Sequence, residues 1–320
     1  MPDKLRKSPT VLLLILTSIG ALGAVEIVLQ IERPGLHDRT YSRVPGPFSI
    51  ASYAEDREFL WSRPFGNEVE GVRFYCHQAK IVYVLGGSIA EGLSGPLFAC
   101  LKERGVSADG FNLACGGWTT YQALRQFRRF IGMRAPTHAV LTTAYNDSRL
   151  GPVTDVAQAE SNRRWSRRLL FGLNQTRLFT LGRRFLARAV EGREPRPITP
   201  RVPVDLYRKN LEDFVHLAHG VGAIPILVTE AFPYDSERED TAPYFVIMES
   251  VARATGALFV DVRPAFEALG VLEISARGID THLNEKQQRF WGDLVHPTEA
   301  GSRVKADLIY DAVAARGGWN

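Results

Sequence analysis

Five residues in four widely separated stretches of the sequence are of the types that acyl-transfer chemistry uses. Ser88, in GGSIAEG, follows an apolar run that ends in two glycines, while Asp293 and His296 stand three residues apart in WGDLVHPTEAG. Gly117, in NLACGG, and Asn146, in TTAYND, each follow another apolar run. Together they offer a nucleophile, a base, a carboxylate to orient the base, and two donors for an oxyanion. The set predicts catalysis through an acyl-enzyme on Ser88.

Simpler structural interpretations exist for each residue. A serine between a strand and a helix is commonly an N-cap, an asparagine often caps a turn, and His296 before Pro297 could cap the last helix. A phosphate-binding loop is disfavoured, because GGSIAEG matches neither Gly-x-Gly-x-x-Gly nor the Gly-Lys-Ser/Thr of a P-loop. The catalytic hypothesis therefore depends on the five residues meeting in space.

The surrounding sequence alternates short apolar runs with helix-period segments. This alternation is typical of a parallel sheet whose two faces are covered by helices, and ligands bind at the carboxyl ends of its strands. Each of the polar residues above follows such a run or precedes the last helix, so the site is expected at that edge. The expected strands are 80–87, 111–117, 138–144, 223–230 and 257–262, and the expected helices are 97–104, 120–131, 206–218, 244–254 and 298–314.

Four sequence blocks resemble those of the SGNH, or GDSL-type, hydrolase superfamily, in the order and approximate spacing of that family. GGSIAEG resembles the block with the nucleophilic serine, NLACGG the block with the oxyanion glycine, AYND the Gly-x-Asn-Asp block, and DLVHP the Asp-x-x-His block. Two positions depart from the family pattern: Gly87 stands where Asp is usual, and Ala144 stands where Gly is usual. The resemblance covers about Lys80 to Ala314.

The resemblance implies a three-layer α/β/α, flavodoxin-like fold with a five-stranded parallel sheet. It also implies that His296 activates Ser88, that Asp293 orients His296, and that the Ser88 and Gly117 amides and the Asn146 side chain form the oxyanion hole. No cofactor or metal is expected. An α/β-hydrolase fold is disfavoured, because no Gly-x-Ser-x-Gly elbow surrounds Ser88.

Other polar and aromatic residues have weaker sequence signals. Trp118, Tyr145 and Glu230 flank the expected site and are candidates for lining a substrate pocket, although core packing explains them equally well. His216 and His219 lack a third metal ligand, which favours a surface or packing role. Three cysteines, Cys76, Cys100 and Cys115, allow at most one disulfide and match no metal motif.

The N-terminus has the pattern of a targeting segment. Lys4, Arg6 and Lys7 precede an apolar stretch that is uncharged from Thr10 to Val25 and continues to Ile31. We expect residues 1–36 to form an uncleaved membrane anchor, with a cleaved signal peptide as the alternative. Residues 37–78 are expected to be a linker and lead-in, and residues 79–320 a hydrolase domain outside the cytoplasm, in the periplasm or cell exterior.

Charge is unevenly distributed along the 320 residues, whose formal net charge is +4. Residues 162–208 hold 12 Arg and 3 acidic residues, a local charge of +9, so the remainder carries −5. This pattern does not predict a nucleic-acid-binding protein. The stretch Arg163–Arg188 has apolar residues at helical spacing, which predicts a helical insertion at about 150–204. It either packs on the body or contacts an anionic membrane or polymer.

The expected function is hydrolysis of O-acyl esters, with an envelope glycan or lipid as the substrate. An acyltransferase would use the same acyl-enzyme, and a glycan-binding or assembly factor could keep the fold without turnover. The sequence does not separate these three alternatives.

Overall fold

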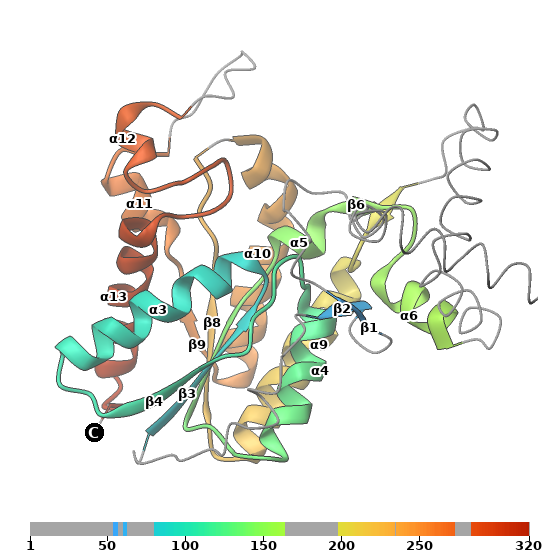
Figure 1. Cartoon of the computed structure of the whole chain (residues 1–320), viewed down its shortest axis with the longest axis horizontal. Coiled ribbons are helices and arrows are strands. Elements are labelled where there is room, and N and C mark those ends of the chain that lie inside the picture. Colours follow the sequence, from blue (N-terminus) through green and yellow to red (C-terminus); the bar gives the residue numbers. More distant parts are fainter. Residues whose placement is uncertain are drawn as a thin grey trace, which may run out of the picture. The chain divides into compact units, whose positions relative to one another are not determined.

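The computed structural model describes residues 54–56, 60–62, 80–163, 198–233, 235–272 and 283–319 (Figure 1). The expected anchor, Cys76 and nearly all of Arg163–Arg188 lie outside the described residues. The chain divides into two units, residues 1–64 with 159–196 and residues 65–158 with 197–320. In the first unit, β1 (Ala54–Asp56) and β2 (Leu60–Ser62) pair antiparallel.

A five-stranded parallel sheet forms the centre of the second unit and confirms the predicted α/β fold class. Along the sheet the order is β4-β3-β5-β8-β9, so β4 lies at one edge and β3 lies between β4 and β5. The chain therefore reverses its direction of winding between β3 and β5, and ligands bind at the carboxyl end of such a switch point. The strands are β3 (Lys80–Gly86), β4 (Ala108–Asn112), β5 (His138–Thr142), β8 (Ile224–Val228) and β9 (Leu258–Val260).

Helices cover both faces of this sheet and complete the three layers (Figure 1). On one face α3 packs along α13, and on the other α9 packs between α4 and α10. The helices are α3 (Ser88–Glu103), α4 (Thr120–Ile131), α9 (Val204–Gly220), α10 (Asp235–Thr255) and α13 (Glu299–Ala314). Shorter elements join them: α5 (Tyr145–Ser148), β6 (Leu150–Gly151), α6 (Asp155–Arg163), β7 (Thr199–Pro200), α11 (Arg263–Ala268) and α12 (Glu285–Gln288).

Strand β3 is apolar and buried from Ile81 onward, because both of its faces are covered. Val82 and Val84 belong to the apolar core beneath α3 and α13. Tyr83 points the other way, where its ring meets Phe127 and Phe130 of α4 edge-on, with centroids 6.5 and 6.4 Å apart. A central parallel strand is buried on both faces, so it lacks the alternation of a half-exposed strand.

Three predicted elements differ most from their expected bounds. Helix α10 begins at Asp235 and not at Tyr244, although Pro243 within it disfavours a helix. The second strand ends at Asn112 and not at Gly117, because the Asn112 side chain accepts the Ala114 N–H, 3.1 Å away, and turns the chain. Residues 113–117 therefore form a loop toward the site. The first helix begins at Ser88 and not near Leu97, although Gly92, Gly95 and Pro96 disfavour a helix. Its buried face, which includes Ile89, Leu93 and Leu97, stabilises it through tertiary packing.

The two described cysteines are buried free thiols, so neither Cys100 nor Cys115 takes part in a disulfide. Burial raises the pKa of Cys100 to about 11, and the hydrogen bond to Asp307 adds to this effect. Among the described helices, none has both the length and the apolar character required to cross a bilayer.

Candidate active site

Ser88, His296 and Asp293 form a continuous chain of hydrogen bonds. Ser88 Oγ lies 2.8 Å from His296 Nε2. On the other side of the ring, His296 Nδ1 lies 2.7 Å from Asp293 Oδ2 and 2.9 Å from Oδ1. The structure thus brings a serine into contact with a histidine that is 208 residues further along the chain.

A short loop holds Asp293 against His296. The loop is closed by a bridge between Trp291 and Pro297, and the Gly292 N–H donates to the His296 carbonyl at 2.8 Å. Within it, Asp293 Oδ1 accepts the backbone N–H groups of Val295 and His296 at 2.8 and 2.7 Å. Partial burial acts to raise the pKa of Asp293, but these N–H groups and the imidazole outweigh it and lower the pKa below its ordinary value. The carboxylate is therefore ionised where it faces the imidazole.

Ser88 is the first residue of α3, and Gly87 is the N-cap. No side chain caps this helix end, and the Ser88 hydroxyl is bonded to the imidazole. The interpretation of Ser88 as a helix cap is therefore wrong. At this position the serine lies at the positive end of the helix dipole, where negative charge is stabilised.

Gly117 lies in a tight turn whose last residue, Trp118, donates its N–H to the Cys115 carbonyl at 3.1 Å. Gly117 is the third residue of this turn and has a φ of 76°, as in type II turns, where a glycine is favoured. Within the described part of the chain, neither the Ser88 N–H nor the Gly117 N–H donates to a protein acceptor. Both remain available to a substrate oxygen.

Asn146 reaches the same place from the short helix α5. Its side-chain Nδ2 donates to the Trp118 carbonyl at 3.0 Å, which uses one of two N–H bonds and leaves the other for a ligand. A Cβ atom built on Gly87 would overlap with Asn146 Nδ2. The Asn146 amide therefore lies against the residue before Ser88 and against the residue after Gly117.

The two departures from the family pattern have different physical consequences. At Gly87, the missing side chain leaves the space that the Asn146 amide occupies. At Ala144, the backbone has a φ of 127°, a value that residues with a Cβ rarely adopt. Ala144 caps α5, so this strained residue fixes the direction in which the helix bearing Asn146 leaves β5.

Glu230 restrains the backbone next to the strained Ala144. Its Oε2 accepts the Tyr145 N–H at 2.8 Å, and the side chain is buried. Burial raises the pKa of Glu230 to about 7, although the charge of Lys305 and the Tyr145 hydrogen bond act to lower it. Lys305, on α13, is also buried, and its Nζ has no hydrogen-bond partner among the described residues. Burial lowers the pKa of Lys305 to about 8.

The three pocket candidates have different positions. Trp118 is 0% exposed and Glu230 is 3% exposed, so neither side chain lines an open surface. Trp118 contacts Asn146 through its backbone carbonyl, and Glu230 contacts the Tyr145 N–H through its buried carboxylate. Tyr145 is partly exposed, with its ring 5.4 Å from that of Phe232 and with the Arg149 guanidinium 5.2 Å from its centroid.

Sequence reasoning missed the polar side chains that support the site. Asp147 is buried, and its Oδ1 accepts the Thr120 N–H at 3.0 Å and the Thr120 hydroxyl at 2.6 Å. Burial raises the pKa of Asp147 to about 7 against these hydrogen bonds. Asp155 and Arg201 form a second cluster near Gly117. The sequence does contain a capping box at Thr119 and Gln122, which marks the start of α4 but does not indicate which distant side chains bond to it.

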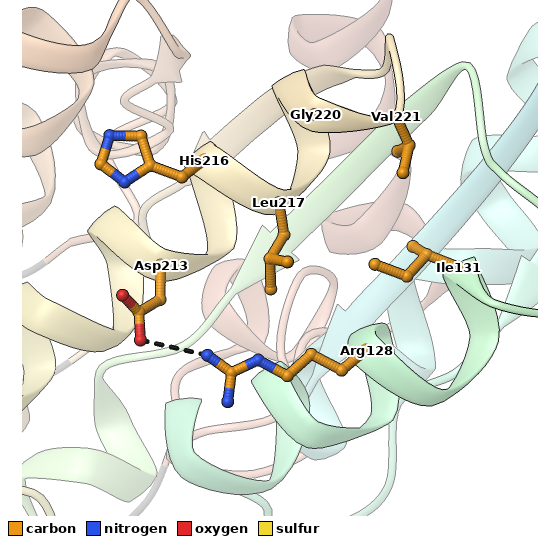
Figure 2. A pocket seen from close by; sticks show the side chains of 7 residues that line it. All are labelled: Arg128, Ile131, Asp213, His216, Leu217, Gly220 and Val221. Atoms are coloured by element: carbon orange, nitrogen blue, oxygen red, sulfur yellow. Dashed lines mark hydrogen bonds and ion pairs between the residues drawn. The ribbon is translucent and has the colours of Figure 1, made fainter.

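A surface hollow of about 410 Å³ lies away from this site, between the C-terminal parts of α4 and α9 (Figure 2). Arg128 and Asp213 form an ion pair of 3.1 Å across it. The exposed His216 also lines it, whereas no candidate site residue does. In the part of the chain that the structure describes, no three His, Cys, Asp or Glu side chains gather as a metal site.

A parallel α/β sheet with a Ser–His–Asp hydrogen-bond chain at its carboxyl edge is an arrangement of serine-dependent hydrolases. The family comparison agrees: the chain belongs to the GDSL-like lipase/acylhydrolase family, whose model matches residues 84–304. The protein is accordingly an acylhydrolase of this family. A search of curated proteins found no match.

Several solved structures are similar to this chain at low sequence identity. An α/β hydrolase from the metagenome of Lake Arreo in Spain, LAE5, is 19% identical, and the alignment covers 76% of this chain and 97% of LAE5 with a TM-score of 0.49. Axe2, an acetylxylan esterase from Geobacillus stearothermophilus, is 15% identical over 74% of this chain and 94% of its own, with a TM-score of 0.49. A putative acylhydrolase from Bacteroides fragilis is 20% identical, covering 75% and 89% of the two chains, with a TM-score of 0.46.

The position of Asn146 predicts that restoring the family's usual aspartate will impair the enzyme. In Gly87→Asp the new Cβ must displace the Asn146 amide, so we expect kcat on a p-nitrophenyl ester to fall by about tenfold or more, with KM little changed. The matched control is Gly95→Asp on the same helix, where a Cβ meets no atom within 4 Å. An unchanged or higher kcat in Gly87→Asp would show that the two side chains do not compete.

The backbone of Ala144 predicts a glycine substitution that stabilises the fold. Ala144→Gly relieves the positive φ, and we expect the free energy of unfolding to rise by about 1 kcal/mol in urea denaturation. Ala123, which is equally buried but lies within α4, is the control, and Ala123→Gly should lower the same quantity by about 1 kcal/mol. A loss of stability in both variants would contradict the strain at Ala144.

Proposed function

We propose that the protein is a serine-dependent esterase that hydrolyses O-acyl esters through an acyl-enzyme on Ser88. The observation that carries the proposal is the 2.8 Å contact between Ser88 Oγ and His296 Nε2, continued to Asp293 by the 2.7 Å contact at Nδ1. Nucleophile and base must lie within about 2.6–3.2 Å for direct proton transfer, and a third group must orient the base. Both distances satisfy these conditions, which supports the proposal.

In the proposed reaction, Ser88 Oγ attacks the ester carbonyl carbon while His296 Nε2 removes the hydroxyl proton. Ionised Asp293 accepts the Nδ1 hydrogen bond and stabilises the imidazolium that forms. The tetrahedral intermediate collapses when His296 returns the proton to the leaving alcohol, which leaves the acyl group on Ser88. Water then attacks this ester with His296 as base, and release of the acid restores the serine.

The oxyanion of each tetrahedral intermediate would be bound by three donors: the backbone N–H groups of Ser88 and Gly117 and the Asn146 side chain. The support is their placement on three loops that touch one another, with the Gly117 turn and the Asn146 amide already bonded. Each donor in such a site contributes about 3 kcal/mol to stabilising the transition state. Because these donors are fixed before reaction, little free energy is lost in reorienting them.

We further propose that the substrate is an acylated glycan or lipid of the cell envelope. The support is sequence-level: the basic and apolar N-terminal residues have the pattern of a membrane anchor, and residues 162–208 have a local charge of +9. An anchored enzyme of this family would meet ester groups at or near the membrane surface. The same pattern supports placing the hydrolase domain outside the cytoplasm.

Labelling with a fluorophosphonate probe tests the role of Ser88. We expect the wild type to be labelled, Ser88→Ala to be unlabelled, and kcat for ester hydrolysis in Ser88→Ala to fall at least about a thousandfold. Ser94→Ala is the matched control: Ser94 lies on the same helix with its hydroxyl bonded to the Glu91 carbonyl, and its loss should leave labelling intact. Absence of labelling in the wild type, or equal labelling of Ser88→Ala, would refute the proposal.

Reporter fusions test the proposed location. Alkaline phosphatase, which requires export to be active, should be active when joined after Asn320, whereas a reporter that works only in the cytoplasm should be inactive there. Deleting residues 1–36 should abolish alkaline phosphatase activity, because the proposed export signal is removed. Activity of the cytoplasmic reporter in the full-length fusion would contradict the topology.

A further inference from the structure

Arg201 lies behind the turn that bears Gly117 and bonds it directly. Its Nη1 donates to the Gly117 carbonyl at 2.8 Å, although 84 residues separate the two in sequence. The remaining guanidinium nitrogens are directed elsewhere: Nε and Nη2 donate to Asp155 Oδ1 and Oδ2 at 3.0 and 2.9 Å. The planar guanidinium is thus fixed in a two-point contact with the carboxylate, and its third nitrogen is aimed at the Gly117 carbonyl.

Asp155 is itself held in place by the N-cap and first turn of α4, a short distance along the chain after Gly117. Its Oδ2 accepts Gln122 Nε2 at 3.1 Å and lies 2.9 Å from the Thr119 hydroxyl. The Asp155 side chain is 3% exposed and that of Arg201 is 16% exposed. The backbones are also joined, because the Asp155 N–H donates to the Arg201 carbonyl at 2.9 Å. The pair is therefore a rigid, shielded unit and not a solvated surface ion pair.

Gly117 needs such support for a physical reason. Glycine has the widest conformational freedom of any residue, and Gly116 precedes it, so the turn has little rigidity of its own. An oxyanion donor is effective only if it is held in position before charge develops. The hydrogen bond from Arg201 restrains the peptide on the C-terminal side of Gly117, and the bond from Asn146 Nδ2 restrains the next carbonyl, that of Trp118.

We propose that Arg201, oriented by Asp155, is a positioning residue: by fixing the Gly117–Trp118 peptide it restricts rotation about the backbone bonds of Gly117, which keeps the Gly117 N–H directed at the substrate oxyanion. This role rests on the proposed function of the site. It is a role in geometry and not in charge, because the carboxylate of Asp155 neutralises the guanidinium at contact distance. Arg201 touches the Gly117 carbonyl, and the proposal requires no contact with the substrate.

The variant Arg201→Gln tests the proposal through the separation of kcat from KM. Loosening the Gly117 donor weakens binding of the transition state more than that of the ground state, so we expect kcat on a p-nitrophenyl ester to fall about tenfold or more, with KM within about threefold of wild type. The matched control is Arg263→Gln, because Arg263 also makes a two-point ion pair, in this case with Asp261 in the same unit of the chain. The control should retain wild-type kcat.

A second variant, Arg201→Lys, covers the case in which Arg201→Gln does not fold. Lysine keeps the charge beside Asp155 but a single ammonium cannot reproduce three directed bonds, so kcat should again fall at nearly constant KM. The variant Asp155→Asn separates geometry from charge. If Arg201 acts by position, the loss of its anchor lowers kcat, whereas a long-range charge effect on the oxyanion would raise kcat once the neutralising carboxylate is gone.

The outcomes distinguish this proposal from the proposed function. Wild-type kcat in folded Arg201→Gln or Arg201→Lys, or a higher kcat in Asp155→Asn, would overturn the positioning role while fluorophosphonate labelling of Ser88 persisted. A loss of kcat in Arg263→Gln equal to that in Arg201→Gln would also overturn it, because any broken ion pair would then have the same effect. Failure of the probe to label Ser88 in the wild type would instead refute the catalytic function.

Discussion

The close approach of the loops after β3 and β5 is the constraint on which the candidate site depends. A Cβ on Gly86 would overlap with the Thr142 carbonyl, and a Cβ on Gly87 would overlap with the Asn146 amide. Because these two strands are neighbours at the switch point of the sheet, their carboxyl ends would diverge if side chains stood between them. The two glycines allow the loops after β3 and β5 to touch, and so place Ser88 beside the side-chain amide of Asn146.

The contact between Ser88 and His296 depends on helix packing and not on the sheet. Helices α3 and α13 pack against each other over one face, and each has a candidate catalytic segment at its N-terminus. Ser88 begins α3, while the loop of Asp293 and His296 leads directly into α13 through its N-cap, Thr298. The apolar core between the two helices therefore fixes the distance between serine and imidazole. Loss of that packing would separate the pair even if every site residue were kept.

Buried polar groups surround the site at some cost in stability. Glu230, Asp147 and Asp155 are each almost fully buried, and a buried carboxylate is unfavourable unless hydrogen bonds satisfy it. Glu230 accepts the N–H of Tyr145, next to Asn146. Asp147 accepts the N–H of Thr120, at the start of α4, and Asp155 binds Arg201, behind Gly117. The loops have glycines and a strained alanine, so they have little stability of their own. The carboxylates hold these segments in one conformation.

The sequence by itself determined the fold class, because five apolar runs separated by helix-period segments can bury their surface only as a covered parallel sheet. It also singled out the five candidate site residues, because their types and order match one chemistry and one family. It misplaced the end of the second strand and the start of the first helix, since the Asn112 turn and the packing of α3 override local preference. It also placed the start of α10 too late, at Tyr244, because the structure continues the helix through Pro243 from Asp235. Tertiary structure alone decided the rest: Trp118 and Glu230 are interior, Gly87 leaves space for Asn146, and Arg201 meets Gly117. Such contacts join residues tens of positions apart, and no local pattern records which distant backbone group a buried side chain will satisfy.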